Sequence, residues 1–101
     1  MAQNLIEEID QQIAANKDMV YSKSTCPHCN TTKQTLQAKN IAFQVVELNQ
    51  VGNGSDIQNA LAQKTGQRTV PNIFINGEHI GGNSELQTIA NNGQLDAKVA
   101  A

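Results

Sequence analysis

The apolar residues near the N-terminus recur every three or four positions. They are Leu5, Ile6, Ile9 and Ile13. Glutamate and glutamine fill most of the positions between them, so the pattern predicts an amphipathic helix over residues 3–15. The short apolar run at 19–21 is typical of a buried strand, and the run at 43–48, rich in β-branched and apolar side chains, predicts a second strand.

Further helices are expected between and after these strands. Pro27 suits the first turn of a helix but not its interior, which indicates a helix from about Cys26 to about Lys39. A helix between two strands implies parallel pairing with a right-handed crossover. After the next loop, Ser55 or Asp56 can cap a third helix.

The second half of the chain carries a hairpin signal. The Asn76-Gly77 dipeptide is typical of a two-residue turn and joins a strand at 73–75 to one at 78–80. Ser84 and Gln87 form a capping-box pattern that opens a further helix. The element order predicts an α/β fold in which helices cover both faces of a mixed four-stranded sheet.

Length, charge and composition narrow the possible functions. A chain of 101 residues is expected to be one domain, residues 1–101. Seven basic against nine acidic residues disfavour nucleic-acid binding, and no apolar run approaches the length of a membrane-spanning helix. The N-terminal segment has neither a basic start nor an apolar stretch, so we expect a cytoplasmic protein with no membrane partner.

The two cysteines are three residues apart, in Cys26-Pro27-His28-Cys29, where the predicted strand gives way to a helix. Unpaired N–H groups and the positive end of the helix dipole stabilise a thiolate at Cys26. Cys29 lies one turn deeper on the same face. The pattern therefore predicts thiol–disulfide exchange, with Cys26 as the nucleophile, Cys29 as the resolving thiol and Lys23 adding positive charge.

The pair has two other interpretations, a zinc site and a permanent disulfide. A zinc site would need His28 and His79 beside the two cysteines, but His28 is expected on a different helix face. A permanent disulfide would close too short a loop to stabilise the fold much. His28 has two interpretations, a catalytic base or an exposed neighbour of the site, while His79 is expected on the strand surface.

Taken together, the motifs resemble those of the dithiol glutaredoxins over nearly the whole chain. The shared markers are Lys23, the Cys-Pro-His-Cys motif at 26–29, Thr-Gly-Gln-Arg-Thr-Val-Pro at 65–71, Phe74, Asn-Gly at 76–77 and Gly-Gly-Asn-Ser at 81–84. The resemblance implies a thioredoxin fold with an extra N-terminal helix. It also implies a cis proline at Pro71 that faces the nucleophilic cysteine, and a monomer.

The resemblance further implies a groove for glutathione as co-substrate. Its expected residues are Lys23, Gln58, Arg68, Thr69, Val70, Pro71, Gly82, Asn83 and Ser84. In such a groove Lys23 binds the glycine carboxylate, and the Val70 backbone pairs with the cysteinyl part as a strand would. Asn83 and Ser84 take the γ-glutamyl carboxylate at a helix N-terminus. Many relatives carry Asp where this chain has Ser84, and Tyr where it has His28.

The implied activity is glutathione-dependent thiol–disulfide exchange. Cys26 alone would serve protein–glutathione mixed disulfides, and Cys26 with Cys29 would serve protein disulfides. A thioredoxin-like reductase is the first alternative, although the chain has no tryptophan and Thr25 precedes Cys26. An iron–sulfur cluster-binding glutaredoxin is the second, although Pro27 stiffens the turn. No metal is expected.

Overall fold

The computed structural model describes residues 2–101, with the side chains of residues 4–101. The elements are α1 (Ala2–Ala15), β1 (Asp18–Ser22), α2 (Pro27–Ala38), β2 (Gln44–Glu47), α3 (Gly54–Thr65), β3 (Asn72–Ile75), β4 (Glu78–Gly81), α4 (Asn83–Asn91) and α5 (Gln94–Ala100). Every predicted element is present, within a few residues of its expected bounds. None of the helices in the described part of the chain is long and apolar enough to cross a membrane.

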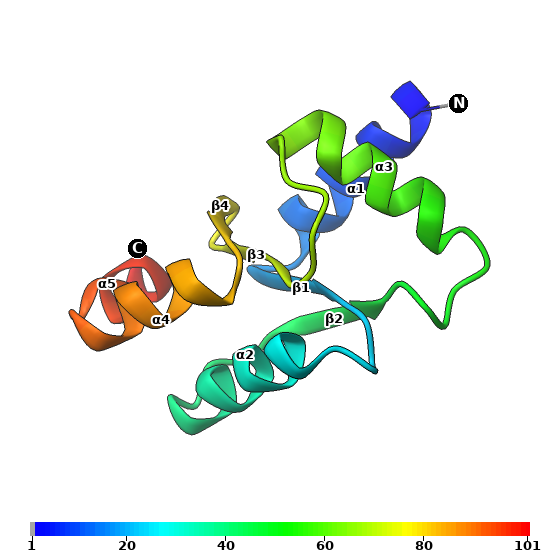
Figure 1. Cartoon of the computed structure of the whole chain (residues 1–101). Helices are drawn as coiled ribbons and strands as arrows, with labels where there is room; N and C mark the ends of the chain where they lie inside the picture. Colours follow the sequence, from blue (N-terminus) through cyan, green and yellow to red (C-terminus); the bar gives the residue numbers. More distant parts are fainter. Residues whose placement is uncertain (1) are drawn as a thin grey trace.

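The four strands form one mixed sheet in the order β2-β1-β3-β4. β1 pairs in parallel with β2, as the helix between them requires, and antiparallel with β3, while β3 and β4 form the hairpin. In Figure 1, α1 and α3 lie on one face of this sheet and α2 and α4 on the other. The structure confirms the predicted thioredoxin-like arrangement.

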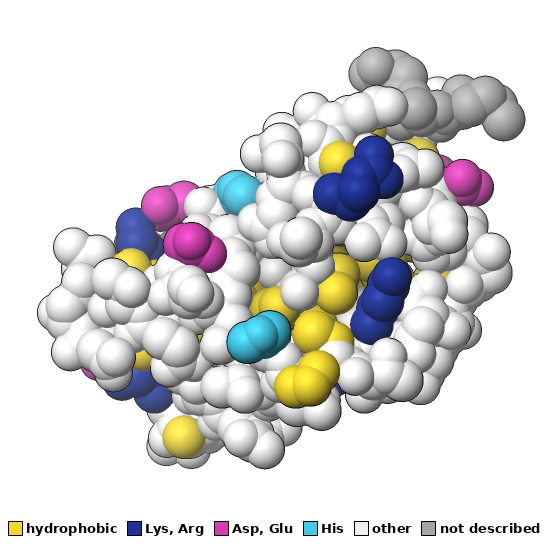
Figure 2. All heavy atoms as spheres, viewed as in Figure 1, with side chains coloured by type: hydrophobic (Ala, Val, Ile, Leu, Met, Phe, Trp, Pro, Cys, Tyr) yellow, Lys and Arg dark blue, Asp and Glu magenta, His cyan; other side chains and the backbone are white. Residues whose placement is uncertain are grey.

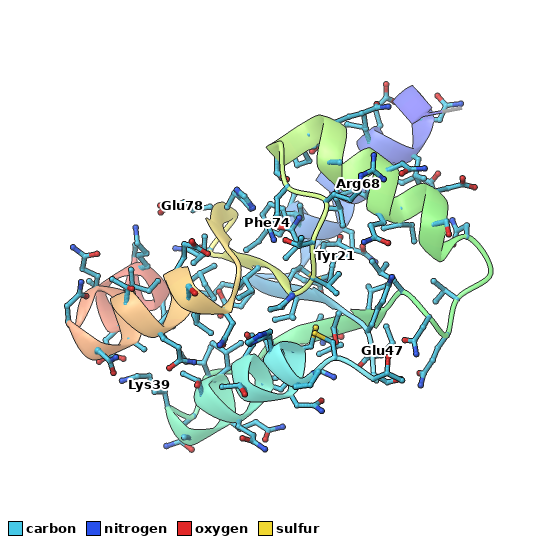
Figure 3. All side chains as sticks on the ribbon, viewed as in Figure 1. Tyr21, Lys39, Glu47, Arg68, Phe74 and Glu78 are labelled. Atoms are coloured by element: carbon cyan, nitrogen blue, oxygen red, sulfur yellow. The ribbon has the colours of Figure 1, made fainter. Side chains whose placement is uncertain are left out.

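Alternate residues of the central strands fill two separate cores. Met19 and Tyr21 of β1 and Phe74 of β3 pack with α1 and α3, whereas Val20 and Ile73 pack with α2, α4 and α5. This alternation is the two-residue period of a strand. The Tyr21 and Phe74 rings meet edge to face with centroids 6.0 Å apart, on the α1 and α3 side of the sheet (Figure 3).

The hairpin turn has the predicted geometry. Asn76 and Gly77 both have positive φ, 52° and 81°, which a type I′ turn needs at its two central positions. Buried Asp18, at the start of β1, accepts a hydrogen bond of 2.9 Å from the Asn76 N–H. The turn that ends the sheet is thereby tied to its central strand.

The start of α3 differs from the prediction. The helix begins at Gly54 with Asn53 as its N-cap, so Ser55 and Asp56 lie inside its first turn and cap nothing. Gly54 is buried, and a Cβ atom built there would lie only 1.8 Å from the Leu48 carbonyl oxygen. The close approach of α3 to the end of β2, which the local pattern did not show, decides where the helix begins.

The start of α4 also differs from the prediction. Gly82 is the N-cap, and its N–H donates a 2.8 Å hydrogen bond to Glu85 Oε1. The predicted partner, Gln87, instead donates to Thr35 Oγ1 of α2 and to Asn83 Oδ1. The helix begins two residues earlier than a Ser84 cap would allow, and the polar Gln87 side chain lies at the α2 interface.

The contact at Gly54 predicts a large effect of adding one methyl group. Gly54→Ala should lower the free energy of unfolding by about 1–3 kcal/mol, the usual cost of forcing an atom into a filled site. Urea denaturation followed by circular dichroism measures the change. Gly52→Ala is the matched control, because a Cβ at Gly52 meets nothing within 4 Å. Equal stabilities for the two variants would contradict this account.

Candidate active site

The Cys26 sulfur lies at the N-terminus of α2. Cys26 is the N-cap, with an extended backbone (φ −94°, ψ 117°), and Pro27 occupies the first turn as predicted. The Cys26 Sγ accepts a hydrogen bond of 3.3 Å from the Cys29 N–H. The sulfur thus takes the place of a capping oxygen, where the helix dipole favours negative charge.

Cys29 differs from Cys26 in its environment. Its side chain is fully buried, whereas Cys26 is partly exposed, and both are free thiols. Burial raises the pKa of the Cys29 thiol and its hydrogen bond with Cys26 raises it further, while contacts with the Lys23 backbone and the Ser22 hydroxyl lower it. The structure therefore offers one accessible and one sheltered thiol, as the spacing predicted.

A polar network lies behind the buried thiol. Fully buried Ser22, at the end of β1, donates a 2.8 Å hydrogen bond to Glu47 Oε1, and the Lys33 ammonium pairs with the other carboxylate oxygen. Glu47 lies at the end of β2, beside α2 (Figure 3). The prediction missed this network, since residues 25 apart in the sequence meet only through the parallel pairing of β1 and β2.

The segment before β3 lies against the Cys26 sulfur. The Val70–Pro71 peptide bond is cis, as the resemblance implied, and the Cys26 thiol lies 3.9 Å from the Val70 carbonyl oxygen. Thr69 is exposed, Val70 is partly buried and Pro71 is buried. Two stretches 44 residues apart therefore meet at the sulfur.

A groove of about 350 Å³ runs beside this contact. It is lined by His28, Thr69, Val70, Pro71, Gly82, Asn83, Ser84 and Glu85. Six of these eight residues are predicted glutathione-binding residues. Figure 2 shows this face of the molecule, with apolar side chains in the floor of a hollow, a histidine at one rim and basic side chains at the other.

The remaining predicted residues lie outside the lining of this groove. Gln58 of α3 donates a 2.7 Å hydrogen bond to the Arg68 carbonyl oxygen, and the Arg68 guanidinium bonds the side chain of Asn59. Arg68 thus lies alongside α3 (Figure 3). Lys23 is partly exposed in the loop after β1, where its carbonyl oxygen accepts a 3.0 Å hydrogen bond from the Cys26 N–H.

A contact between α2 and α4 joins the cysteine motif to the far wall of the groove. Buried Thr32 donates a 2.9 Å hydrogen bond through its hydroxyl to Asn83 Oδ1. The side-chain oxygen of Asn83 therefore already accepts a hydrogen bond from within the protein. Thr32 is not among the predicted site residues, although its place three residues after Cys29 puts it on the same helix face.

The two histidines lie in different surroundings. His28 is exposed at the rim of the groove. His79 is exposed on β4 as predicted, but its ring packs on Phe74 and its Nε2 lies 2.9 Å from Oδ1 of buried Asn72. Burial lowers the pKa of His79. In the described part of the chain, no three His, Cys, Asp or Glu side chains are grouped closely enough to hold a metal ion.

Sequence comparison with known proteins finds similarity to the glutaredoxins. The glutaredoxin family model matches residues 19–80. Glutaredoxin-1 of Saccharomyces cerevisiae is 43% identical over 100 residues, covering 95% of this chain and 91% of the relative. A glutaredoxin of Vernicia fordii is 47% identical over 83 residues, covering 82% and 80% of the two chains.

Solved structures give the same result. The crystal structure of a buckwheat glutaredoxin–glutathione complex superposes with a TM-score of 0.95 at 35% identity, over 98% of this chain and 90% of that one. Glutaredoxin C1 from Populus tremula x tremuloides, in its holo form, superposes with a TM-score of 0.92 at 33% identity, over 96% of each chain. Family and fold support glutathione-dependent thiol oxidoreductase chemistry. The chain belongs to the glutaredoxin family.

Proposed function

We propose that this protein removes glutathione from protein–glutathione mixed disulfides through Cys26, and reduces protein disulfides through Cys26 and Cys29 together. The observation that carries the proposal is the position of the Cys26 sulfur. It caps α2 and lies 3.9 Å from the Val70 carbonyl oxygen, at the wall of an open groove. A nucleophile and a surface for an extended peptide thus lie side by side.

In the first reaction the Cys26 thiolate attacks the glutathione sulfur of the mixed disulfide. A bond forms between Cys26 and glutathione, and the protein thiolate leaves and takes a proton. A second glutathione, as thiolate, then attacks the glutathione sulfur on Cys26. Glutathione disulfide leaves, made of the glutathione from the mixed disulfide and the second glutathione, and the Cys26 thiolate is restored. In the net reaction one reduced glutathione converts the mixed disulfide to protein thiol and glutathione disulfide.

In the second reaction Cys26 attacks one sulfur of a protein disulfide and forms a mixed disulfide with the protein. Cys29 then loses its proton and attacks Cys26, which releases the reduced protein and leaves a Cys26–Cys29 disulfide. Two glutathione molecules reduce that disulfide. Cys29 is fully buried against the N-cap sulfur, which suits it to resolve an intermediate on Cys26 but not to meet a large substrate first.

Donors for the two ends of glutathione come from the groove and from residues outside its lining. The N-terminus of α4 carries unpaired N–H groups that suit a carboxylate. Glu85 already accepts from the Gly82 N–H, so the N–H groups of Asn83 and Ser84 are those left for the γ-glutamyl carboxylate. Lys23 is our candidate for the glycine carboxylate, with Gln58 and Arg68 beside it, and the Val70 backbone for the cysteinyl part.

The assignment of the two thiols predicts different outcomes for their removal. Cys26→Ser should abolish deglutathionylation of a small glutathionylated peptide, because a serine hydroxyl is not ionised at neutral pH. Cys29→Ser should retain it, because glutathione itself resolves the intermediate. The rates are measured with glutathione and glutathione reductase. Activity in Cys26→Ser, or its complete loss in Cys29→Ser, would contradict the scheme.

The sheltered thiol predicts the pH dependence of the resolving step. Burial raises the pKa of Cys29 above the ordinary 9.0, so its thiolate fraction still increases above pH 9. Cys26 glutathionylated in advance should therefore release glutathione, in single-turnover experiments, about tenfold faster per pH unit until the raised pKa is reached. Cys29→Ser is the control and should release none. A rate that levels off below pH 8 would contradict the prediction.

The charge of Lys23 should contribute to glutathione binding. Lys23→Gln removes a cation from the proposed site of the glycine carboxylate, and should raise the Kd for glutathione by about three- to tenfold in low salt. Isothermal titration calorimetry measures it. Lys17→Gln makes the same change in charge at an exposed position after α1, and should leave the Kd unchanged. If the two variants bind equally well, Lys23 does not contact the ligand.

A further inference from the structure

We propose that Gln67 is a positioning residue for glutathione, because its side-chain amide holds the backbone of residues 69–71 in the orientation that presents Val70 to the ligand. The inference rests on the proposed function, since it concerns the same groove. Gln67 does not line that groove. It therefore acts through the backbone segment, from behind.

The amide of Gln67 bonds both carbonyl groups that flank Val70. Its Nε2 donates to the Thr69 oxygen at 3.0 Å and to the Pro71 oxygen at 2.9 Å. Both partners are carbonyl oxygens, which only accept, so the nitrogen and not the oxygen of the amide must face them. A side-chain amide has two N–H donors, and each of them meets one acceptor.

These two bonds hold the backbone around Val70. Gln67 binds the carbonyl groups of Thr69 and Pro71, on either side of Val70, so the backbone is held at both ends of the cis Val70–Pro71 unit. The Val70 carbonyl itself has a different partner. It lies 3.9 Å from the Cys26 sulfur. The two bonds from Gln67 thus hold the Val70 backbone beside the Cys26 thiol.

Gln67 is itself held by its neighbours. Its N–H donates to Thr65 Oγ1 at 3.0 Å, and its carbonyl oxygen accepts from the Asn72 side chain at 3.4 Å. Asn72 is buried and bonds His79 of β4 through its other side-chain atom. Gln67 therefore connects the end of α3, the start of β3 and the segment between them.

The same amide also lies beside the opposite wall of the groove. A Cβ atom built on Gly82 would lie 3.7 Å from the Pro71 carbonyl oxygen and 4.0 Å from Gln67 Nε2. Gly82 caps α4, whose N-terminus is our site for the γ-glutamyl carboxylate. The Gln67 side chain thus lies between the Val70 segment and the N-terminus of α4, the two parts of the proposed glutathione site.

The test replaces the amide by a carboxylate of the same shape. Gln67→Glu puts acceptors against two carbonyl oxygens, so the segment must turn away, and the apparent KM for a glutathionylated peptide should rise about tenfold. The kcat should change less than twofold, because the Cys26 cap is untouched. Gln63→Glu makes the same charge change at an exposed position of α3 and should leave both constants unchanged. Assays use the full chain with glutathione and glutathione reductase.

The outcomes separate this inference from the function on which it rests. An unchanged KM in Gln67→Glu, or a loss confined to kcat, would overturn the positioning role while the wild type stays active. No deglutathionylation by the wild type would instead refute the proposed function. If circular dichroism shows Gln67→Glu unfolded, Gln67→Ala replaces it. Water then reaches the two carbonyl groups, and the KM should rise about threefold. An unchanged KM in Gln67→Ala would also overturn the inference.

Discussion

The hydrogen bond from the Cys29 N–H to the Cys26 sulfur fixes the sulfur at the N-terminus of α2. A helix start leaves N–H groups without partners, and here a side-chain sulfur satisfies one of them. The same bond joins two thiols in different surroundings, because the residue that caps is partly exposed and the residue that donates is buried one turn inside the helix. The rest of the site is arranged around this point. The sulfur lies beside the cis Val70–Pro71 segment and next to the groove that the N-terminus of α4 lines.

Uncharged hydrogen bonds, more than ion pairs, hold the walls around this sulfur. Thr32 ties α2 to α4 through Asn83, and Gln67 ties the segment before β3 to its neighbours. Asparagine and glutamine supply 24 of the 101 residues, and their amides both donate and accept without the desolvation cost of a charge. The side chains of Thr32, Asn83 and Gln67 therefore hold these walls without placing a charge beside the sulfur.

Local sequence patterns predict the helices, strands and turns of this molecule better than they predict the contacts between them. The strands, the Asn76-Gly77 turn and the placement of Cys26 followed from periodicity, turn chemistry and the proline at the first helical position. The caps of α3 and α4 did not. Gly54 begins α3 because its backbone meets the Leu48 carbonyl, a contact that no pattern within the helix shows. The cap of α4 is local, since the Gly82 N–H donates to Glu85 three residues later, and Gln87 bonds Thr35 of α2 instead of closing the predicted capping box.

By itself the sequence determined the pair of thiols, their order along a helix, and the elements that carry them, since these depend on residues within one or two helical turns of each other. Only the tertiary structure decided what meets those thiols. Val70 comes to within 3.9 Å of Cys26 from 44 residues away, Asn83 reaches Thr32 across 51, and Glu47 meets Ser22 across 25. Such contacts arise from the packing of helices on a shared sheet, and no periodicity along the chain encodes them.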